Sequence, residues 1–163
     1  MRKRYAIAFL SSALLGTALH FGYLLLPNPI TALFCPFNES VWEHLKLLYW
    51  PVLLTGFFLH RRKLQSQRAW SGTLLSMLLM PLVVTGVFYI LHCGFSFNSS
   101  IVDIASYYLT LAFGFAVAYQ AERSGKIEKL GGILVILVGL YGAALILFTY
   151  AAPDLPIFQQ IIK

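Results

Sequence analysis

A chain of 163 residues with 59 % hydrophobic and 11 % charged side chains has too little polar surface for a soluble domain, in which about 25 % of residues are charged. In a membrane, lipid replaces water as the solvent, so an apolar exterior is favourable there. The formal net charge of +6 does not indicate nucleic-acid binding, because the basic residues lie between apolar runs rather than in one stripe.

Five apolar runs are long enough for a helix to cross the hydrocarbon core, which takes about 20 residues. They are Tyr5–Leu26, Val41–Leu59, Gly72–Leu91, Ile101–Tyr119 and Leu130–Ala151. The first run is too long for the apolar region of a signal peptide, and no small-residue cleavage site follows it. The sequence therefore predicts an all-α protein, a polytopic transmembrane helix bundle of five spans that forms a single domain over residues 1–163.

The charged residues are divided unevenly between the two sides of this bundle. Ten of the twelve basic residues lie before the first span, between the second and third spans, or between the fourth and fifth. The other side carries four of the six acidic residues, which are Glu39, Glu43, Asp103 and Asp154. Because cytoplasmic loops are enriched in Lys and Arg, we expect the N-terminus in the cytoplasm and the C-terminus outside.

The segment Asn38–Lys46 is the most polar part of the apolar sequence, and it opens the second span. At 3.6 residues per turn, Glu39 stacks near Glu43, and Ser40 stacks near His44. Exposing such groups to lipid costs about 2–3 kcal/mol or more, so they usually face a polar interior. The segment is therefore a candidate functional site.

The same segment also has a structural interpretation. Ser40 followed three residues later by Glu43 forms a capping box, which satisfies free backbone N–H groups at a helix start. Lys46 can pair with Glu43, which lies three residues earlier. Capping explains Ser40 and Glu43, but it does not explain why Glu39 and His44 lie beside them.

Several ionisable residues share a position near the outer end of their helices. They are His20, Glu39, Glu43, His44, His92 and Asp103. Imidazole and carboxylate groups in one layer are ligands for zinc or another divalent metal, with His44, Glu43, His92, Asp103 and His20 as the candidates. They could equally form a proton relay or a ligand-binding network. His60, beside Arg61 and Arg62, is expected to belong to the cytoplasmic basic signal.

Both cysteines lie on the predicted outer side, Cys35 in the first outer loop and Cys93 directly after His92. An even number of cysteines on an oxidising side is compatible with a disulfide. A bridge would join the loop before the second span to the end of the third span. Two free thiols are the alternative.

The stretch Asn38-Glu39-Ser40-Val41-Trp42-Glu43-His44-Leu45-Lys46-Leu47, followed by Pro51, resembles the signature of an uncharacterised family of small integral membrane proteins, common in Gram-positive bacteria. The resemblance extends through His20, Asp103 and the tail Pro153–Phe158. It implies a multi-pass protein of a bacterial cytoplasmic membrane and supplies no activity.

This segment also resembles, more weakly, the membrane hydrolases that include alkaline ceramidases and adiponectin receptors. Those enzymes use a Ser-x-x-x-His element, an Asp and further histidines around zinc. Ser40 and His44 have that spacing, and Asp103 and His92 could supply the rest. Those proteins have seven helices and a late pair of histidines that this chain lacks, so the likeness is one of chemistry.

Three functions fit the sequence. The first is a metal-dependent hydrolase or transferase at the outer leaflet, acting on a lipid or lipid-linked substrate. In it the metal activates water, Glu39 is the general base, and Ser40 orients Glu39 or the substrate. The second is an ion or small-solute binding or transport protein. The third is a non-catalytic membrane partner subunit.

Overall fold

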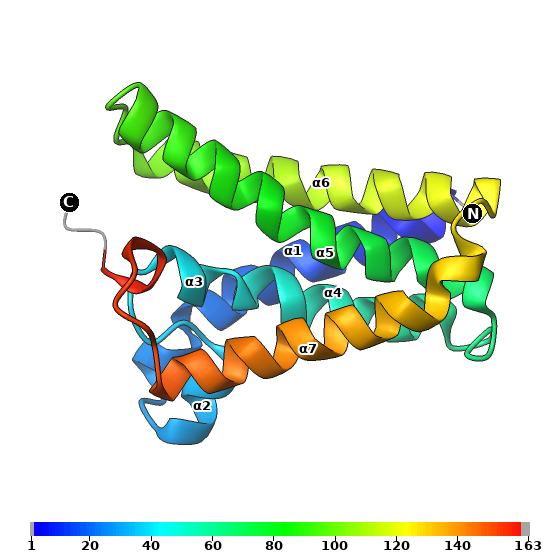
Figure 1. The fold of residues 1–163 in the computed structure, drawn as a ribbon, viewed down its shortest axis with the longest axis horizontal. Coiled ribbons are helices and arrows are strands. Elements are labelled where there is room, and N and C mark those ends of the chain that lie inside the picture. Colours follow the sequence, from blue (N-terminus) through cyan, green and yellow to red (C-terminus); the bar gives the residue numbers. More distant parts are fainter. Residues whose placement is uncertain (1, 161–163) are drawn as a thin grey trace.

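The computed structural model describes residues 2–160, and every regular element in that range is a helix (Figure 1). The longer helices are α1 (Arg2–Leu25), α4 (Lys46–His60), α5 (Gln67–Tyr89), α6 (Ser100–Ser124) and α7 (Gly131–Tyr150). The shorter ones are α2 (Pro29–Phe34), α3 (Val41–His44), the π-helix η1 (Ile90–Gly94), and the 3₁₀-helices η2 (Glu128–Leu130) and η3 (Pro156–Phe158). The predicted all-α class is confirmed.

Within residues 2–160, four helical segments are long and apolar enough to cross a membrane. They are Lys3–Leu25, Gln67–Gly94, Ser100–Ser124 and Glu128–Tyr150. Large hydrophobic side chains such as Leu14, Leu82 and Leu140 are exposed along them. An apolar surface of this extent suits lipid rather than water. The structure is therefore that of a membrane protein.

The predicted second span, Val41–Leu59, is divided into α3 and α4, with Leu45 between them. The division is a local tightening, because the Leu45 N–H donates to the Trp42 carbonyl three residues back at 3.1 Å. Leu45 itself keeps helical backbone angles, with φ −63° and ψ −23°. α4 has 15 residues, which rise about 22 Å along the helix axis. This is less than the roughly 30 Å of the hydrocarbon core.

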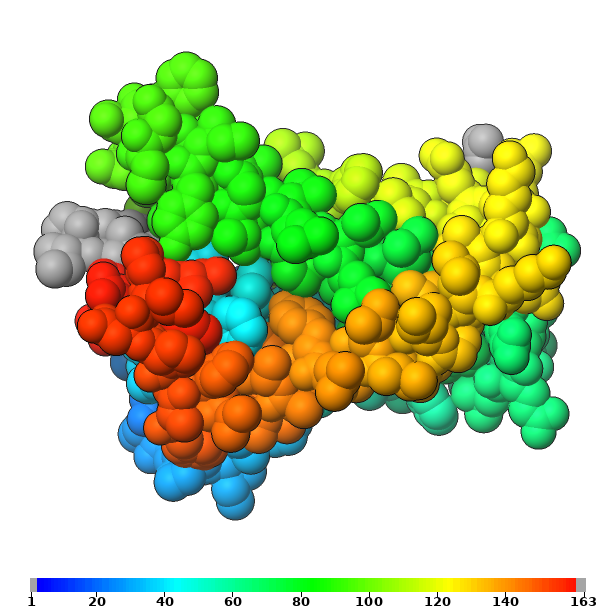
Figure 2. Space-filling view, in the orientation of Figure 1, coloured from blue at the N-terminus to red at the C-terminus, as the bar shows by residue number. Residues whose placement is uncertain are grey.

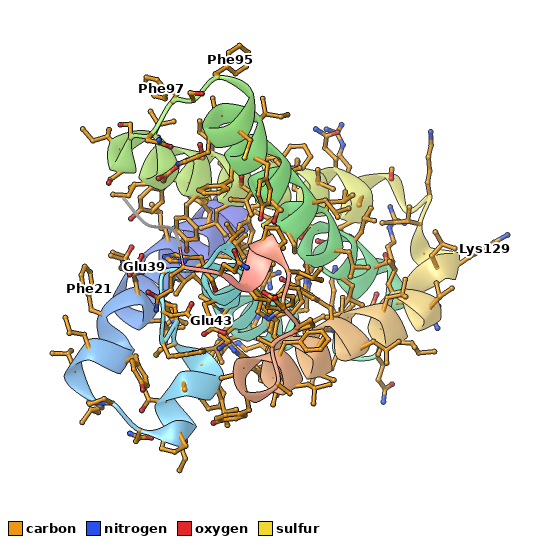
Figure 3. The ribbon with its side chains drawn as sticks, turned by 60° about the vertical axis from the view of Figure 1, so that its left-hand side comes forward. Phe21, Glu39, Glu43, Phe95, Phe97 and Lys129 are labelled. Carbon is orange, nitrogen blue, oxygen red and sulfur yellow. The ribbon has the colours of Figure 1, made fainter. Side chains whose placement is uncertain are left out.

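The helices pack side by side around a shared core. α5 and α6 form a hairpin, α1 lies against α4 and α6, and α7 lies against α5. The far end of the hairpin, where Figure 3 labels Phe95 and Phe97, projects from the rest of the molecule (Figures 2 and 3). Among the largest fully buried core side chains are Met77 and Met80 on α5, Leu111 on α6 and Leu145 on α7.

The two ends of the bundle differ in charge. One end holds the start of α1 and the turns after α4 and α6, with Arg61, Arg62, Lys63, Arg68, Arg123, Lys126 and Lys129. We call this the basic end. The opposite end holds α2, α3, the tip of the α5–α6 hairpin and the segment after α7 (Figure 1). We call it the acidic end, because Glu39, Glu43, Asp103 and Asp154 belong to it.

A proline inside α4 explains one contact between helices. Pro51 has no N–H, so the Leu47 carbonyl four residues earlier lacks its helical donor. Tyr107 on α6 supplies the missing donor, with its hydroxyl 3.2 Å from the Leu47 oxygen. Gly16 on α1 leaves room for this ring, since a Cβ there would collide with the Tyr107 hydroxyl. The irregularity in α4 therefore joins three helices.

A face of α1 that carries the small residues Ser12 and Gly16 packs against α4. Ser12 is fully buried, and its hydroxyl lies 2.6 Å from that of Thr55. The Thr55 hydroxyl also donates to the Pro51 carbonyl at 2.8 Å. Small side chains at this spacing let two helices approach closely, and the same face directs His20 toward α3.

The structure distinguishes the two cysteine alternatives and adds a partner for His60. Cys35 and Cys93 are free thiols, the first buried and the second exposed. His60 lies at the basic end, as expected, but its side chain is buried. It is 3 % exposed, and its Nε2 lies 2.9 Å from the Thr73 hydroxyl on α5. Burial with a hydroxyl partner makes His60 a packing residue.

Candidate functional site

A buried ion pair fixes the segment that carries the polar residues of the acidic end. The Lys46 Nζ lies 2.5 Å from Glu43 Oε2, and their side chains are 0 % and 2 % exposed. Lys46 also donates to the Ala32 carbonyl at 2.7 Å, while Glu43 Oε2 accepts from the Phe37 N–H at 3.2 Å. The pair thus connects α2 and the loop before α3 to α3 and α4.

Ser40 begins α3 in the predicted way. Its hydroxyl accepts from the Glu43 N–H at 3.3 Å, which is the capping half of the predicted box. The other half differs, because the Glu43 carboxylate points to Lys46. Ser40 is 1 % exposed, and its backbone forms an isolated bridge with Gln160. These contacts give Ser40 a structural role at the base of the site.

Three side chains from three segments meet above this base. His20 comes from α1, Glu39 from the loop before α3, and His44 from the end of α3. One ligand atom of each lies within 4.8 Å of the other two, and this is the only such group of three or more among residues 2–160. The Nε2 of His44 is 3.5 Å from Glu39 Oε2, and the two imidazole centroids are 5.3 Å apart. We call these residues the His–Glu–His cluster.

The tautomer of His44 follows from its backbone contact. Its Nδ1 lies 2.8 Å from the Ser40 carbonyl oxygen, which can only accept, so Nδ1 carries the proton in the neutral ring. Nε2 is then the free lone pair, and it faces Glu39. Metal-ligating histidines usually donate their second nitrogen to a carbonyl or carboxylate in this manner.

The cluster is open to its surroundings. The Glu39 side chain is 68 % exposed and that of His44 is 33 % exposed, while His20 is half-buried. Figure 3 shows Glu39 at the edge of the acidic end, at the opposite end of the molecule from Lys129. A ligand could therefore reach these side chains without any helix moving.

His92 and Asp103 form a separate pair at the tip of the α5–α6 hairpin. His92 Nε2 lies 3.6 Å from Asp103 Oδ1. The other ring nitrogen donates to the Phe88 carbonyl at 3.0 Å, and the ring stacks on Phe88 with centroids 3.9 Å apart. The five predicted ligands are thus divided in the structure: His20 and His44 meet with Glu39, Glu43 pairs with Lys46, and His92 pairs with Asp103.

A second polar group, at the basic end, has no counterpart in the sequence analysis. Glu122 on α6 is 7 % exposed, accepts from the Tyr5 hydroxyl at 2.6 Å and lies 3.5 Å from Lys63 Nζ. His60 borders the same small cavity of about 20 Å³. The sequence signal for this group is Glu122 itself, an acidic residue beside Arg123 and Lys126 at the end of a predicted span. This group ties α1 to α6.

The whole chain, residues 1–163, matches the family of unknown function DUF6512, and the protein belongs to that family. The expected membership in an uncharacterised family is thereby confirmed. No curated protein and no solved structure matches the chain. The chemistry of the His–Glu–His cluster is therefore the guide to function.

Proposed function

We propose that this DUF6512 protein is a five-span membrane protein that binds zinc, or a similar divalent ion, through His20, Glu39 and His44 at its extracytoplasmic end. The single observation that carries the proposal is the meeting of three ligand atoms from separate segments within 4.8 Å. We further propose that the bound ion serves hydrolysis or group transfer on a lipid or lipid-linked substrate.

The charge difference between the ends supports the orientation. At the basic end, seven Lys and Arg residues lie in the two connections between helices or in the helix ends beside them, and such basic segments stay on the cytoplasmic side. The acidic end is then extracytoplasmic. Residues 41–60 together would rise about 30 Å, so α3 and α4 combined match the fifth span that α4 alone is too short to provide.

The donor set supports zinc. Two histidines and one glutamate are the protein ligands of known catalytic zinc sites, which keep a fourth position for water or substrate. Ligand atoms on a tetrahedral zinc ion with bonds of about 2.0–2.1 Å lie roughly 3.3 Å apart. The 3.5 Å between His44 Nε2 and Glu39 Oε2 is close to that value.

The position of the cluster supports a lipid-related substrate. His20 lies near the end of a spanning helix, and exposed apolar side chains such as Phe21 and Leu24 follow it on α1. A zinc ion in an open site lowers the pKa of its water and polarises a carbonyl or phosphoryl oxygen. Glu39 is exposed enough to contact both the ion and a substrate. The backbone carbonyl of Ser40 holds His44 in its tautomer, while the Ser40 hydroxyl caps α3.

The decisive experiment is metal analysis of the purified protein with matched variants. We expect about one zinc ion per chain in the wild type after dialysis against trace zinc. His20→Gln, Glu39→Gln and His44→Gln should each reduce zinc affinity at least tenfold. His92→Gln is the control, because His92 belongs to the acidic end but not to the cluster, and it should retain the metal.

Two results would contradict this proposal. Wild-type protein that binds no divalent ion at neutral pH would leave the three side chains as a hydrogen-bonded group without metal. Equal loss of zinc in His92→Gln and His44→Gln would place the ligands elsewhere. If zinc binds but no lipid ester or amide is cleaved, the metal site stands and the hydrolase proposal fails.

A further inference from the structure

The basic end contains a hollow of about 380 Å³ between the start of α5 and the start of α7. The two helix starts lie side by side in Figure 1, which agrees with the contacts of α5 with η2 and α7. Ligand sites for small molecules span about 300–1,000 Å³. The hollow is therefore large enough for part of an amphiphile, and none of its lining residues belongs to the His–Glu–His cluster.

Apart from Leu64, the lining changes from polar to apolar along the helix axis. Gln65, Ser66 and Gln67 form a polar rim where α5 begins, and Trp70 and Leu74 follow on that helix. From Ser66 to Leu74 the helix rises about 12 Å, so the apolar wall reaches into the membrane while the rim stays at its boundary. This is the polarity profile of a lipid, with a headgroup at the rim and a chain along the wall.

The charge around the rim selects the kind of headgroup. Arg61 and Arg62 precede the rim by a few residues, and Lys129 lies in η2, beside the acidic Glu128 and two residues before α7. All four side chains are exposed, and the cations outnumber Glu128. Figure 3 shows Lys129 extending from this end. The N-terminal ends of α5 and α7 add partial positive charge. Basic pockets between transmembrane helices at the cytoplasmic boundary suit anionic headgroups.

Two neighbouring glycines on α7 line the hollow, and they differ in their surroundings. A Cβ at Gly131 would lie 3.3 Å from Gln67 Cβ, so Gly131 permits close packing of α7 on α5. A Cβ at Gly132 would meet no atom within 4 Å. Helix packing therefore does not require glycine at 132. Because Gly132 lines the hollow, a large side chain at this position would extend into it.

We propose that this hollow binds one anionic phospholipid of the cytoplasmic leaflet. The phosphate would lie at the rim formed by Gln65, Ser66 and Gln67, near the exposed cations. The first part of an acyl chain would lie along Trp70, Leu74 and Val135. The site is independent of zinc, because it lies at the opposite end of the bundle from the His–Glu–His cluster.

The test uses the full chain in nanodiscs and counts lipids retained in native mass spectrometry after transfer to detergent. Probes are phosphatidylglycerol and phosphatidylcholine with identical chains. We expect one phosphatidylglycerol retained by the wild type, at least tenfold more than phosphatidylcholine. Gly132→Leu fills the hollow and should reduce retention at least tenfold. Gly139→Leu is the matched control, because it lies two turns further along α7, also has no atom within 4 Å of its Cβ, and is outside the hollow.

A further variant tests the electrostatic part. Arg62→Gln combined with Lys129→Gln should weaken phosphatidylglycerol binding and reduce its dependence on salt. Equal retention of the two lipids would overturn the headgroup assignment. Wild-type retention by Gly132→Leu, with an unfolding midpoint equal to that of Gly139→Leu, would overturn the site itself. Displacement of the lipid by millimolar inorganic phosphate would show that the rim alone binds and that the apolar wall contributes nothing.

Discussion

The Tyr107 hydroxyl on α6 is the substitute donor for the Leu47 carbonyl on α4, at 3.2 Å. In the membrane core, a backbone carbonyl that lacks a protein donor has no water molecule to hydrogen-bond it. Leaving such a group unsatisfied costs about 1–3 kcal/mol. The contact therefore compensates for Pro51, and it can be tested quantitatively.

We expect Tyr107→Phe to lower the free energy of unfolding by about 1–3 kcal/mol. Tyr108→Phe is the control, because the Tyr108 hydroxyl bonds only the exposed Thr17 hydroxyl, which also has the Ala13 carbonyl. In a Pro51→Ala background the amide returns, so Tyr107→Phe should cost less there. A double-mutant cycle, with unfolding measured in mixed micelles, gives the cost of Tyr107→Phe in both backgrounds. Equal costs would refute the role of the Tyr107 hydroxyl as substitute donor.

The buried pair of Glu43 and Lys46 gives the second prediction. Lys46→Met leaves the Glu43 carboxylate buried without its cation, which should destabilise the protein by about 3–5 kcal/mol. Glu43→Leu added to Lys46→Met should recover much of this loss. Lys126→Met, on an exposed side chain, should change stability by about 0.5 kcal/mol or less. A double variant less stable than Lys46→Met would mean that the ion pair is not the source of the effect.

The third prediction concerns zinc and stability. A ligand that binds only the folded state stabilises it by about 2.7 kcal/mol at 100 times its dissociation constant. We expect zinc to raise the unfolding midpoint of the wild type and of His92→Gln but not of His44→Gln. Metal binding requires imidazoles without a proton on the ligating nitrogen, so the shift should shrink as pH falls below neutrality. An undiminished shift at pH 5 would exclude histidine ligands.

The fourth prediction separates the two cysteines. Burial raises the pKa of the Cys35 thiol, so less of it is thiolate at neutral pH. Its sulfur also lies against Gly22 of α1. Cys93 is exposed. We expect a maleimide to label Cys93 at least tenfold faster than Cys35 in the folded protein, and equally in denaturant. Mass spectrometry of the peptides measures both rates, and faster labelling of Cys35 would contradict this arrangement.

The fifth prediction tests the orientation. In a chain without native cysteines, Ser96→Cys should react with an impermeant reagent in intact cells, because it lies at the acidic end. Arg62→Cys should react only after the cells are opened. The reverse pattern would invert the proposed topology and would move the proposed phospholipid to the outer leaflet.

Much of the fold followed from the length and apolarity of the runs. Tyr5–Leu26, Gly72–Leu91, Ile101–Tyr119 and Leu130–Ala151 fall within or close to four observed helices, since a helix in lipid must satisfy its own backbone. α2 lies in the predicted first outer loop, because a run of six residues is too short to show a helical period. The break at Leu45 also has no sequence signal, because its angles stay helical.

The site was predictable only where its contacts are local. The cap at Ser40 and the pair of Glu43 with Lys46 span three residues each, and both followed from helical spacing. The grouping of His20 with His44 depends on how α1 packs on α3 and α4, which no spacing rule contains. The same holds for Tyr5 and Glu122, separated by 117 positions.

That separation has a consequence for the making of the protein. α1 leaves the ribosome long before α6, so the Tyr5 hydroxyl enters the bilayer without its Glu122 acceptor and without the ring of Tyr119 that packs against it. The first helix therefore lacks these contacts to α6 until most of the chain has been synthesised. His20 and His44, by contrast, belong to the first third of the chain, so the cluster can form while the basic end is still unfinished.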